Sequence, residues 1–234
     1  MNQQKELSVI VPIYNEEKTV VTLMQKLVSA VPDAEIIYVN DGSTDQSLQF
    51  VREHARPEDK VLTKQNGGKG SAVRHGLMQA RGEYTIIQDA DLEYEPTDIN
   101  RLLRAAQEGG HDAVLGSRRL QKQDRRYAKL KYYVGGVLLN TVFNILNAGG
   151  LTDMNTCYKL VRTSILQSFP LRENGFGLDA EIVSHLARRN ISIHEIGITY
   201  NPRSAEEGKK ITGWHFFHLL WVLMRVRSSG KGAN

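Results

Sequence analysis

The chain is organised around the stretch Tyr84-Thr85-Ile86-Ile87-Gln88-Asp89-Ala90-Asp91-Leu92-Glu93-Tyr94. Its first four residues have the character of a buried strand, and Pro96 opens the next helix-like segment. Between them, Asp89, Asp91 and Glu93 place three carboxylates at alternate positions. Such charge at a strand end requires a cation or basic groups beside it, and carboxylate oxygens suit Mg²⁺ or Mn²⁺. The stretch predicts either a metal site or a solvated acidic turn before a helix.

The bulk composition indicates one large globular core and a mildly basic surface. With 234 residues, of which 41% are hydrophobic and 24% charged, the chain can bury one large core, alone or with a small appendage. The formal net charge of +4 favours anionic partners such as nucleotides, phospholipid headgroups or nucleic acid, without choosing among them.

Cysteine usage and hydropathy restrict the class of protein further. The single cysteine, Cys157, excludes an internal disulfide and a cysteine-based zinc cage, and a reducing cytoplasm is the simplest setting. Residues 1–6 are polar and lack the apolar core of a signal peptide. Because no uninterrupted apolar run reaches the ~20 residues that cross a bilayer, we expect a chain that does not span a membrane by itself.

Outward from the acidic stretch, strand-length apolar runs alternate with segments of helical periodicity. We expect strands at residues 7–13, 35–39, 61–63, 84–88 and 113–115. The helices between them should end near residues 31, 55, 80 and 107, and Asn15 is the expected cap of the first. This alternation predicts an α/β fold with a mainly parallel central sheet and helices on both faces.

The polar clusters of the first half fall where the predicted strands end. They are Tyr14-Asn15-Glu16, Asn40-Asp41-Gly42 and Asp89-Ala90-Asp91. Because ligands of parallel α/β sheets bind at the carboxyl ends of the strands, these turns should meet at one edge. Three turns at one edge indicate a site more strongly than any one of them.

The second half of the chain differs in composition, with a basic segment and longer apolar and aromatic stretches. A basic segment contains Arg118, Arg119, Lys122, Arg125, Arg126, Lys129 and Lys131. An apolar stripe at helical spacing follows over residues 134–145, then a strand at 157–162, a helix at 178–189 and an extended segment at 191–200. The aromatic stretch at 214–225 is too short to span a bilayer. It predicts a helix that lies at a membrane interface, or one that packs on its own domain or on a partner.

Taken together, the motifs resemble those of the family 2 glycosyltransferases with a GT-A fold, especially the polyprenyl-phosphate sugar synthases such as the dolichol-phosphate mannose synthases. The resemblance covers residues 7–211. It implies a GT-A (Rossmann-like) catalytic domain at 1–211, a membrane- or partner-contacting interfacial helix at 212–227 and a flexible tail at 228–234. The motifs that carry it, in chain order, are Val9-Ile10-Val11-Pro12-Ile13-Tyr14-Asn15-Glu16, Val39-Asn40-Asp41-Gly42-Ser43-Thr44-Asp45, Gly67-Gly68-Lys69-Gly70, Asp89-Ala90-Asp91, Gly116-Ser117-Arg118, Leu178-Asp179-Ala180-Glu181, and Arg203 with Gly208-Lys209-Lys210.

The resemblance also implies roles for individual residues. Catalysis falls to Asp89, Asp91 and Arg118, and Mg²⁺ or Mn²⁺ is held by Asp89, Asp91 and Glu93, although mannose synthases often carry an amide at the position of Glu93. The cation would bridge the protein and the donor diphosphate. The residues implied to bind the nucleotide sugar are Pro12, Tyr14, Glu16, Asp41, Lys69, Asp89, Ala90, Asp91 and Arg203.

The acceptor implied by this subgroup is a lipid monophosphate. A phosphate oxygen is already anionic near neutral pH, so its attack on the anomeric carbon needs cations to position it rather than a base. The implied cations are Arg118, Lys131, Arg203 and Lys209. Asp179 lies where saccharide-transferring relatives place a catalytic base, and here it is expected to orient the acceptor or the sugar, or simply to begin a helix.

These implications describe a metal-dependent, inverting enzyme. It would move a hexose from a nucleotide-diphosphate sugar, of the GDP-mannose or UDP-glucose type, to an undecaprenyl or dolichyl phosphate. It would act peripherally on the cytoplasmic face of a membrane, alone or with a small membrane subunit, and without nucleic acid.

Three alternatives compete with this interpretation. The first keeps the fold but has a saccharide acceptor, with Asp179 as the base, in cell-surface polysaccharide assembly. The second is a non-catalytic basic module that binds a membrane or nucleic acid, and it leaves the three carboxylates unexplained. An NAD-dependent oxidoreductase is disfavoured because Pro12-Ile13-Tyr14-Asn15 lacks the glycines that let a pyrophosphate approach a helix.

Overall fold

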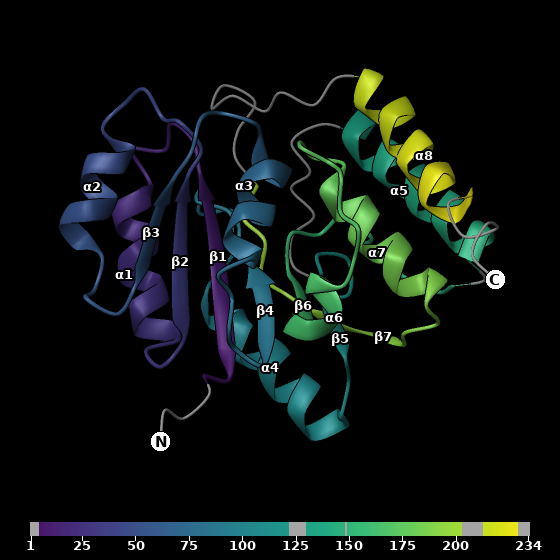
Figure 1. Cartoon of the computed structure of the whole chain (residues 1–234). Coiled ribbons are helices and arrows are strands. Elements are labelled where there is room, and N and C mark those ends of the chain that lie inside the picture. The colour runs from purple at the N-terminus through teal and green to yellow at the C-terminus, as the bar shows by residue number, and fades with distance from the viewer. Residues whose placement is uncertain (1–4, 122–129, 148, 203–212, 229–234) are drawn as a thin grey trace.

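A mixed seven-stranded sheet forms the centre of the molecule, in the order β3-β2-β1-β4-β6-β5-β7 (Figure 1). The computed structural model describes residues 5–121, 130–147, 149–202 and 213–228. Within these residues only β6 runs antiparallel to its neighbours, β4 and β5, so the prediction of a mainly parallel sheet is confirmed. The strands are β1 (Leu7–Ile13), β2 (Glu35–Asn40), β3 (Lys60–Thr63), β4 (Tyr84–Ile87), β5 (Ala113–Ser117), β6 (Lys159–Arg162) and β7 (Ile193–Gly197).

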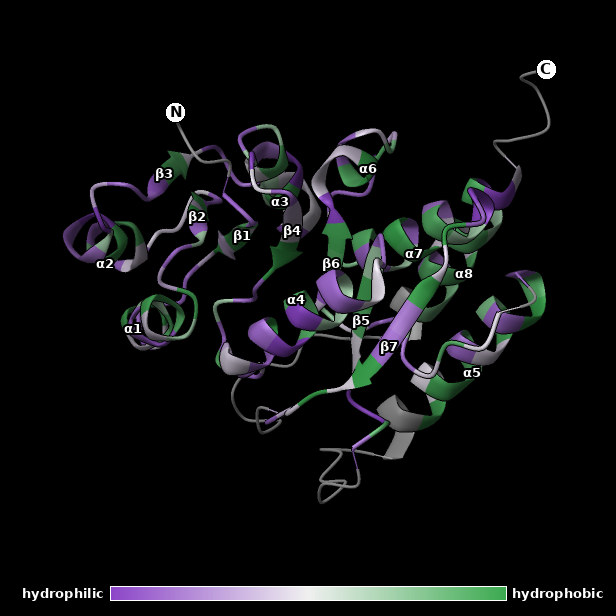
Figure 2. Ribbon diagram, turned by 90° about the horizontal axis from the view of Figure 1, so that it is seen from below, coloured by the Kyte–Doolittle hydropathy of each residue, from purple (hydrophilic) through white to green (hydrophobic). Residues whose placement is uncertain are grey.

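Helices cover both faces of the sheet, as the alternation predicts. Seen along the strands, α1 and α4 lie on one face and α3 and α6 on the other (Figure 2). The helices are α1 (Val20–Ala30), α2 (Ser47–His54), α3 (Lys69–Leu77), α4 (Thr97–Gly109), α5 (Leu130–Asn147), α6 (Thr163–Gln167), α7 (Leu178–Arg188) and α8 (Gly213–Ser228).

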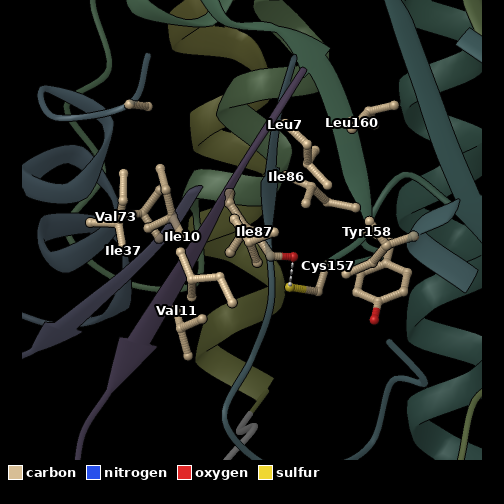
Figure 3. Close-up of a cluster of buried hydrophobic side chains, with 14 of the residues drawn as sticks. Leu7, Ile10, Val11, Ile37, Val73, Ile86, Ile87, Cys157, Tyr158 and Leu160 are labelled. Atoms are coloured by element: carbon tan, nitrogen blue, oxygen red, sulfur yellow. Dashed lines mark hydrogen bonds between the residues drawn. The ribbon is translucent and has the colours of Figure 1, made fainter. Parts of the chain in front are cut away.

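The main core lies between the sheet and these helices. Strands β1, β2 and β4 are buried along almost their whole length, as expected for strands that are covered on both sides. Figure 3 shows side chains of β1 and β4 meeting those of the segment that leads into β6, where the Cys157 thiol lies 3.4 Å from the Ile87 carbonyl oxygen. Cys157 is therefore a small buried side chain. Labelled members of this cluster are Leu7, Ile10, Val11, Ile37, Val73, Ile86, Ile87, Cys157, Tyr158 and Leu160.

A second, smaller core joins α5, α7 and α8. Leu139 and Phe143 of α5 meet Val183 of α7 and Val222 and Leu223 of α8, and all five are buried. Figure 1 shows α8 lying along α5. The aromatic stretch therefore packs one side on its own domain, while Phe217, Trp221 and Met224 are more than half exposed on the other.

Several sequence-based boundaries differ from the structure. Asn15 does not cap α1, which begins at Val20 after Thr19. Asn15 has a φ of 55°, and its side-chain oxygen accepts a hydrogen bond from the Thr44 N–H instead. The helix expected to reach residue 80 ends at Leu77, and the strand expected from residue 157 begins at Lys159.

Candidate active site

The turns after β1 and β2 are fastened to each other by short polar side chains. The Asn15 N–H donates to the Ser43 hydroxyl, and the Thr44 N–H donates to the Asn15 side chain, at 3.1 and 2.8 Å. This contact keeps Tyr14, which is 48% exposed, beside the β2 turn. Glu16 is anchored as well, since its N–H donates to Ser47 at 2.8 Å. A half-exposed aromatic ring next to a polar turn is suited to stacking on a nucleotide base.

Asp41, at the end of β2, organises the glycine turn that leads into α3. Its buried carboxylate accepts hydrogen bonds from the Gly67 and Gly68 N–H groups and from the Lys64 ammonium, at 2.7 to 3.2 Å. Gly68 has a φ of 90°, which a residue with a side chain rarely adopts. These contacts occupy the lone pairs of both carboxylate oxygens. Asp41 is thus a scaffold for this turn, and its contact with a nucleotide stays a prediction.

The three carboxylates of the acidic stretch face different partners. Asp89 pairs with Lys69 at 2.9 Å, Asp91 accepts the Glu93 N–H at 3.1 Å, and Glu93 accepts the Tyr200 hydroxyl at 2.7 Å. Among the residues that the structure describes, no three His, Cys, Asp or Glu side chains converge as a cation site. The Glu93 carboxylate is bonded to Tyr200, and its role as a third metal ligand stays a prediction.

The backbone of the same turn is held in an uncommon conformation. Leu92 has a φ of 61°, which costs a branched side chain of order 1–3 kcal/mol and is found mainly at functional sites. The turn still offers the oxygen atoms of Asp89 and Asp91 at the sheet edge, and Mg²⁺ commonly takes one or two carboxylates together with substrate phosphates. The residues present therefore fit a hard divalent cation with two protein ligands.

Behind this turn, charges of alternating sign extend into the interior. Lys69 lies 2.9 Å from Asp89 and 3.5 Å from Asp179, and the fully buried Lys159 lies 2.9 Å from Asp179. Burial by itself raises the pKa of Asp179, but Lys159 and Lys69 outweigh it and hold that pKa below its usual value. Lys69 is held charged in turn, because Asp179 and Asp89 raise its pKa in spite of burial. Asp179 is consequently a poor proton acceptor.

Glu181, the second carboxylate of this predicted motif, has a structural role. It is 1% exposed and accepts the backbone N–H groups of Arg172 and Glu173 together with the Arg225 guanidinium. Its oxygens face a loop and a helix of its own domain. No chemistry needs to be assigned to it.

Arg118 follows β5 and is held in a fixed orientation. Its Nε and one terminal nitrogen donate to the two oxygens of Asp153 at 2.7 and 2.8 Å, and its guanidinium lies 5.1 Å from the centre of the Tyr200 ring. Burial lowers the pKa of Arg118, but Asp153 raises it well above its usual value. The side chain remains 22% exposed. An oriented, permanently charged guanidinium suits a phosphate.

Not every predicted acceptor residue can be placed. Arg203 and Lys209 lie outside the described residues, and Lys131 belongs to α5 with its side chain outside them. The sequence reasoning missed Lys159 and Asp153, which neutralise Asp179 and orient Arg118. Lys159 carried a signal, since a lysine inside a predicted strand needs a buried partner. The pairing of Asp153 with Arg118 was not predictable, because the two residues lie 35 positions apart in the sequence.

Known structures share this fold. Glucosyl-3-phosphoglycerate synthase from Mycobacterium tuberculosis, in complex with phosphoglyceric acid, superposes with a TM-score of 0.74 at 18% identity, over 96% of this chain and 80% of that chain. The same enzyme with Mn²⁺, UDP and glucosyl-3-phosphoglycerate superposes with a TM-score of 0.73 at 18% identity, over 96% and 80% of the two chains. These similarities confirm the GT-A-like architecture.

Curated relatives are similar in sequence. An undecaprenyl-phosphate 4-deoxy-4-formamido-L-arabinose transferase from Photorhabdus laumondii is 31% identical over 174 residues, which are 71% of this chain and 52% of that protein. The enzyme of that name from Aeromonas hydrophila is 28% identical over 228 residues, 94% of this chain and 67% of that protein. The chain spans about half to two thirds of the length of these relatives.

A match to a family model completes the comparison. The model of glycosyl transferase family 2 matches residues 8–169, from β1 through the acidic turn and Arg118 to the segment after α6. The fold, the order of the motifs and this match agree. The chain belongs to glycosyl transferase family 2.

Proposed function

We propose that this chain transfers a glycosyl group from a nucleotide-diphosphate sugar to a polyprenyl phosphate, with Mg²⁺ or Mn²⁺. The observation that carries the proposal is the pairing of Asp179 with two ammonium groups, at 2.9 and 3.5 Å. A hydroxyl acceptor needs a base, and a carboxylate with a lowered pKa serves poorly as one. A phosphate monoester needs only orientation, which Arg118 offers.

The proposed donor contacts lie at the end of β1, in the turn after it and at the start of α3. Tyr14 and Pro12 would line the nucleotide base, and Lys69, whose ammonium lies 2.9 Å from Asp89, would contact the donor diphosphate when Asp89 holds a cation. When bound, the cation offsets the negative charge that develops on the leaving diphosphate. The relatives that bind Mn²⁺ or Mg²⁺ together with UDP support this choice of ion.

The reaction balances without a proton transfer. A phosphate oxygen of the acceptor, oriented by Arg118, forms the new bond to the anomeric carbon from the side opposite the diphosphate. The bond from that carbon to the diphosphate breaks, and its electron pair leaves with the nucleotide. The anomeric configuration is therefore inverted.

The choice of acceptor and sugar draws on the relatives. Their names give undecaprenyl phosphate as the acceptor and a formamido-arabinose as the sugar. The motifs resemble those of hexose-transferring synthases, so we propose a hexose donor and place the arabinose-type donor beside it in the test panel.

The location follows from the acceptor. No helix in the described ranges is long and apolar enough to cross a bilayer. We propose peripheral attachment at the cytoplasmic face, where the exposed Phe217, Trp221 and Met224 of α8 would enter the interface. Flotation with vesicles of zwitterionic lipid and with vesicles that contain anionic lipid measures this. Loss of flotation in Trp221→Ser is expected, and unchanged flotation contradicts it.

Transfer itself is tested with purified protein, a short-chain polyprenyl phosphate, Mg²⁺ and a panel of labelled UDP- and GDP-sugars. We expect one donor to give a lipid-linked product that is lost in Asp91→Asn. Arg118→Lys should raise KM for the lipid phosphate more than KM for the donor, because a lysine cannot reproduce the fixed fork. Absence of product with every donor sinks the proposal.

The saccharide-acceptor alternative is tested in the same assay. Asp179→Asn should slow transfer to a sugar acceptor strongly if Asp179 is a base. Transfer to the lipid phosphate should instead retain most of its kcat with a higher KM for the donor, because no base is needed there. Circular dichroism checks folding, since the substitution removes the charged partner of the buried Lys159 as well as one partner of Lys69.

A further inference from the structure

The polar side of α8 reaches into the loop that precedes α7. Arg225 lies 2.9 Å from Glu173 and 2.6 Å from Glu181, and Nε2 of His218 lies 2.8 Å from Glu173. Both glutamates are almost completely buried. Since a buried carboxylate without a cation is costly, this pair of glutamates depends on α8.

The two glutamates set the backbone of residues 172–174. The Glu181 carboxylate accepts the N–H groups of Arg172 and Glu173 at 2.9 to 3.0 Å. The two terminal nitrogens of Arg225 bind different glutamates: Nη1 contacts Glu173 and Nη2 contacts Glu181. The loop is thereby fixed at two successive residues to the start of α7 and to α8.

The same loop lies flush against the first turn of α3. The Ser71 N–H donates to the Asn174 carbonyl oxygen at 3.1 Å. A Cβ atom at Gly70 would overlap the Glu173 carbonyl, and one at Gly68 would lie 2.6 Å from the Asn174 carbonyl oxygen. Residues 172–174 therefore form the wall against which the Gly68–Gly70 turn rests.

Lys69 lies between these two glycines. Its ammonium is the group that pairs with Asp89 and Asp179. A displacement of the wall moves the backbone of Lys69, and the ammonium moves with it. An unbroken set of contacts thus joins Arg225 of α8 to the acidic turn.

We propose that Arg225 of the C-terminal helix α8 is a positioning residue for Lys69, acting through Glu173, Glu181 and the backbone of residues 172–174. The structural part of this proposal is independent of the reaction. Its consequence for donor binding rests on the proposed function.

Hydrogen–deuterium exchange of the full chain tests the structural part. Arg225→Met should speed amide exchange in peptides that cover 67–74 and 171–177 by roughly tenfold, because losing a charge-assisted contact lowers local protection by about that factor. Arg227→Met is the matched control, since Arg227 is exposed on the same helix two residues away. Exchange in β1 and β2 should stay unchanged in both variants.

A second variant distinguishes a displaced loop from a general destabilisation of α8. Glu173→Gln removes one partner of Arg225 while Glu181 still holds α8, and it should speed exchange in 67–74 without affecting peptides of α8. Unchanged exchange in 67–74 in both Arg225→Met and Glu173→Gln overturns the proposal. Faster exchange throughout the chain also overturns it, because Arg225 would then support the fold as a whole.

The consequence for donor binding is measured separately, in the transfer assay. Arg225→Met should raise KM for the nucleotide sugar roughly tenfold and leave KM for the lipid phosphate near its original value, and Arg225→Lys should restore part of the loss. Equal increases in both KM values contradict positioning of Lys69. If the wild type transfers nothing, the proposed function fails, while the exchange result still decides the structural part.

Discussion

The half of the molecule from β1 to α4 and the half from β5 to α8 are stabilised in different ways. In the first half, charged side chains of the strands lie at their ends, and β1 and β4 contain none. In the second half, ionised groups at the start of the elements are buried: Lys159 is the first residue of β6, and Asp179 and Glu181 lie in the first turn of α7.

The difference teaches where the chemistry of this fold is located. Apolar burial between sheet and helices needs no particular partner, so the first half offers a rigid edge with functional turns. Buried ions need specific partners, so the second half fixes the position of charges such as Arg118 and Lys69. Donor contacts are expected mainly at the first half and acceptor contacts at the second.

The largest effect is expected at the acidic turn of the first half. Asp91→Asn should lower kcat/KM roughly 10³-fold or more with an unchanged fold, because a cation contributes several kcal/mol of charge stabilisation in the transition state. The transfer assay measures this, with circular dichroism as the check on folding. Glu93→Gln is the matched control and should lose less than roughly tenfold, since Glu93 faces Tyr200. An equal loss of kcat/KM in the two variants would indicate that Glu93 is also a metal ligand.

The next effect compares two strand lysines. Lys159→Met should lower the free energy of unfolding by about 4 kcal/mol, because it leaves the buried Asp179 with Lys69 alone. Lys60→Met, whose side chain is 31% exposed in β3, should cost less than about 1 kcal/mol. Urea unfolding measures both. Equal losses would show that the halves do not differ in this way.

The third effect concerns pH and a buried histidine of the second half. Burial, with Arg188, Arg189 and Arg225 nearby, lowers the pKa of His185 from 6.5 to about 4. Below pH 6.5 His185 binds a proton in the unfolded chain, whereas in the folded chain it binds one only near pH 4. The free energy of unfolding therefore falls as the pH falls through this window.

This shift corresponds to about 3 kcal/mol. His185→Leu should remove that part of the pH dependence in unfolding experiments between pH 4 and 6.5. His54→Leu, on the exposed surface of α2 in the first half, is the control and should leave the dependence as in the wild type. A steep dependence that survives in His185→Leu contradicts the assignment.

The smallest effect tests the apolar half. Ile10→Val removes one methylene from β1 and should cost about 1 kcal/mol, with the same value at each pH of that window, since no charge is involved. Met78→Ala, at an exposed position, should stay within about 0.5 kcal/mol. A pH-dependent cost at Ile10 would contradict the assignment of β1 to purely apolar packing.

Much of the fold could be predicted because its signals are local. The apolar run of β1 and the acidic turn after β4 are readable from neighbouring residues, since burial on both faces demands continuous apolar strands. The predicted cap at Asn15 failed because that amide bonds the Thr44 turn, which lies 29 residues away. The antiparallel direction of β6 was not predictable either, because its partners are set by the path of the chain after α5.

By itself, the sequence determined the α/β class, the sheet edge that carries the functional turns and the residue types present there. Local periodicity and turn chemistry suffice for these. Only the tertiary structure decided that Glu93 turns to Tyr200, that Asp179 is held by two lysines and that Arg225 supports the wall beside Lys69. Partners of buried charges are remote in sequence, and electrostatic pairing depends on distance in space.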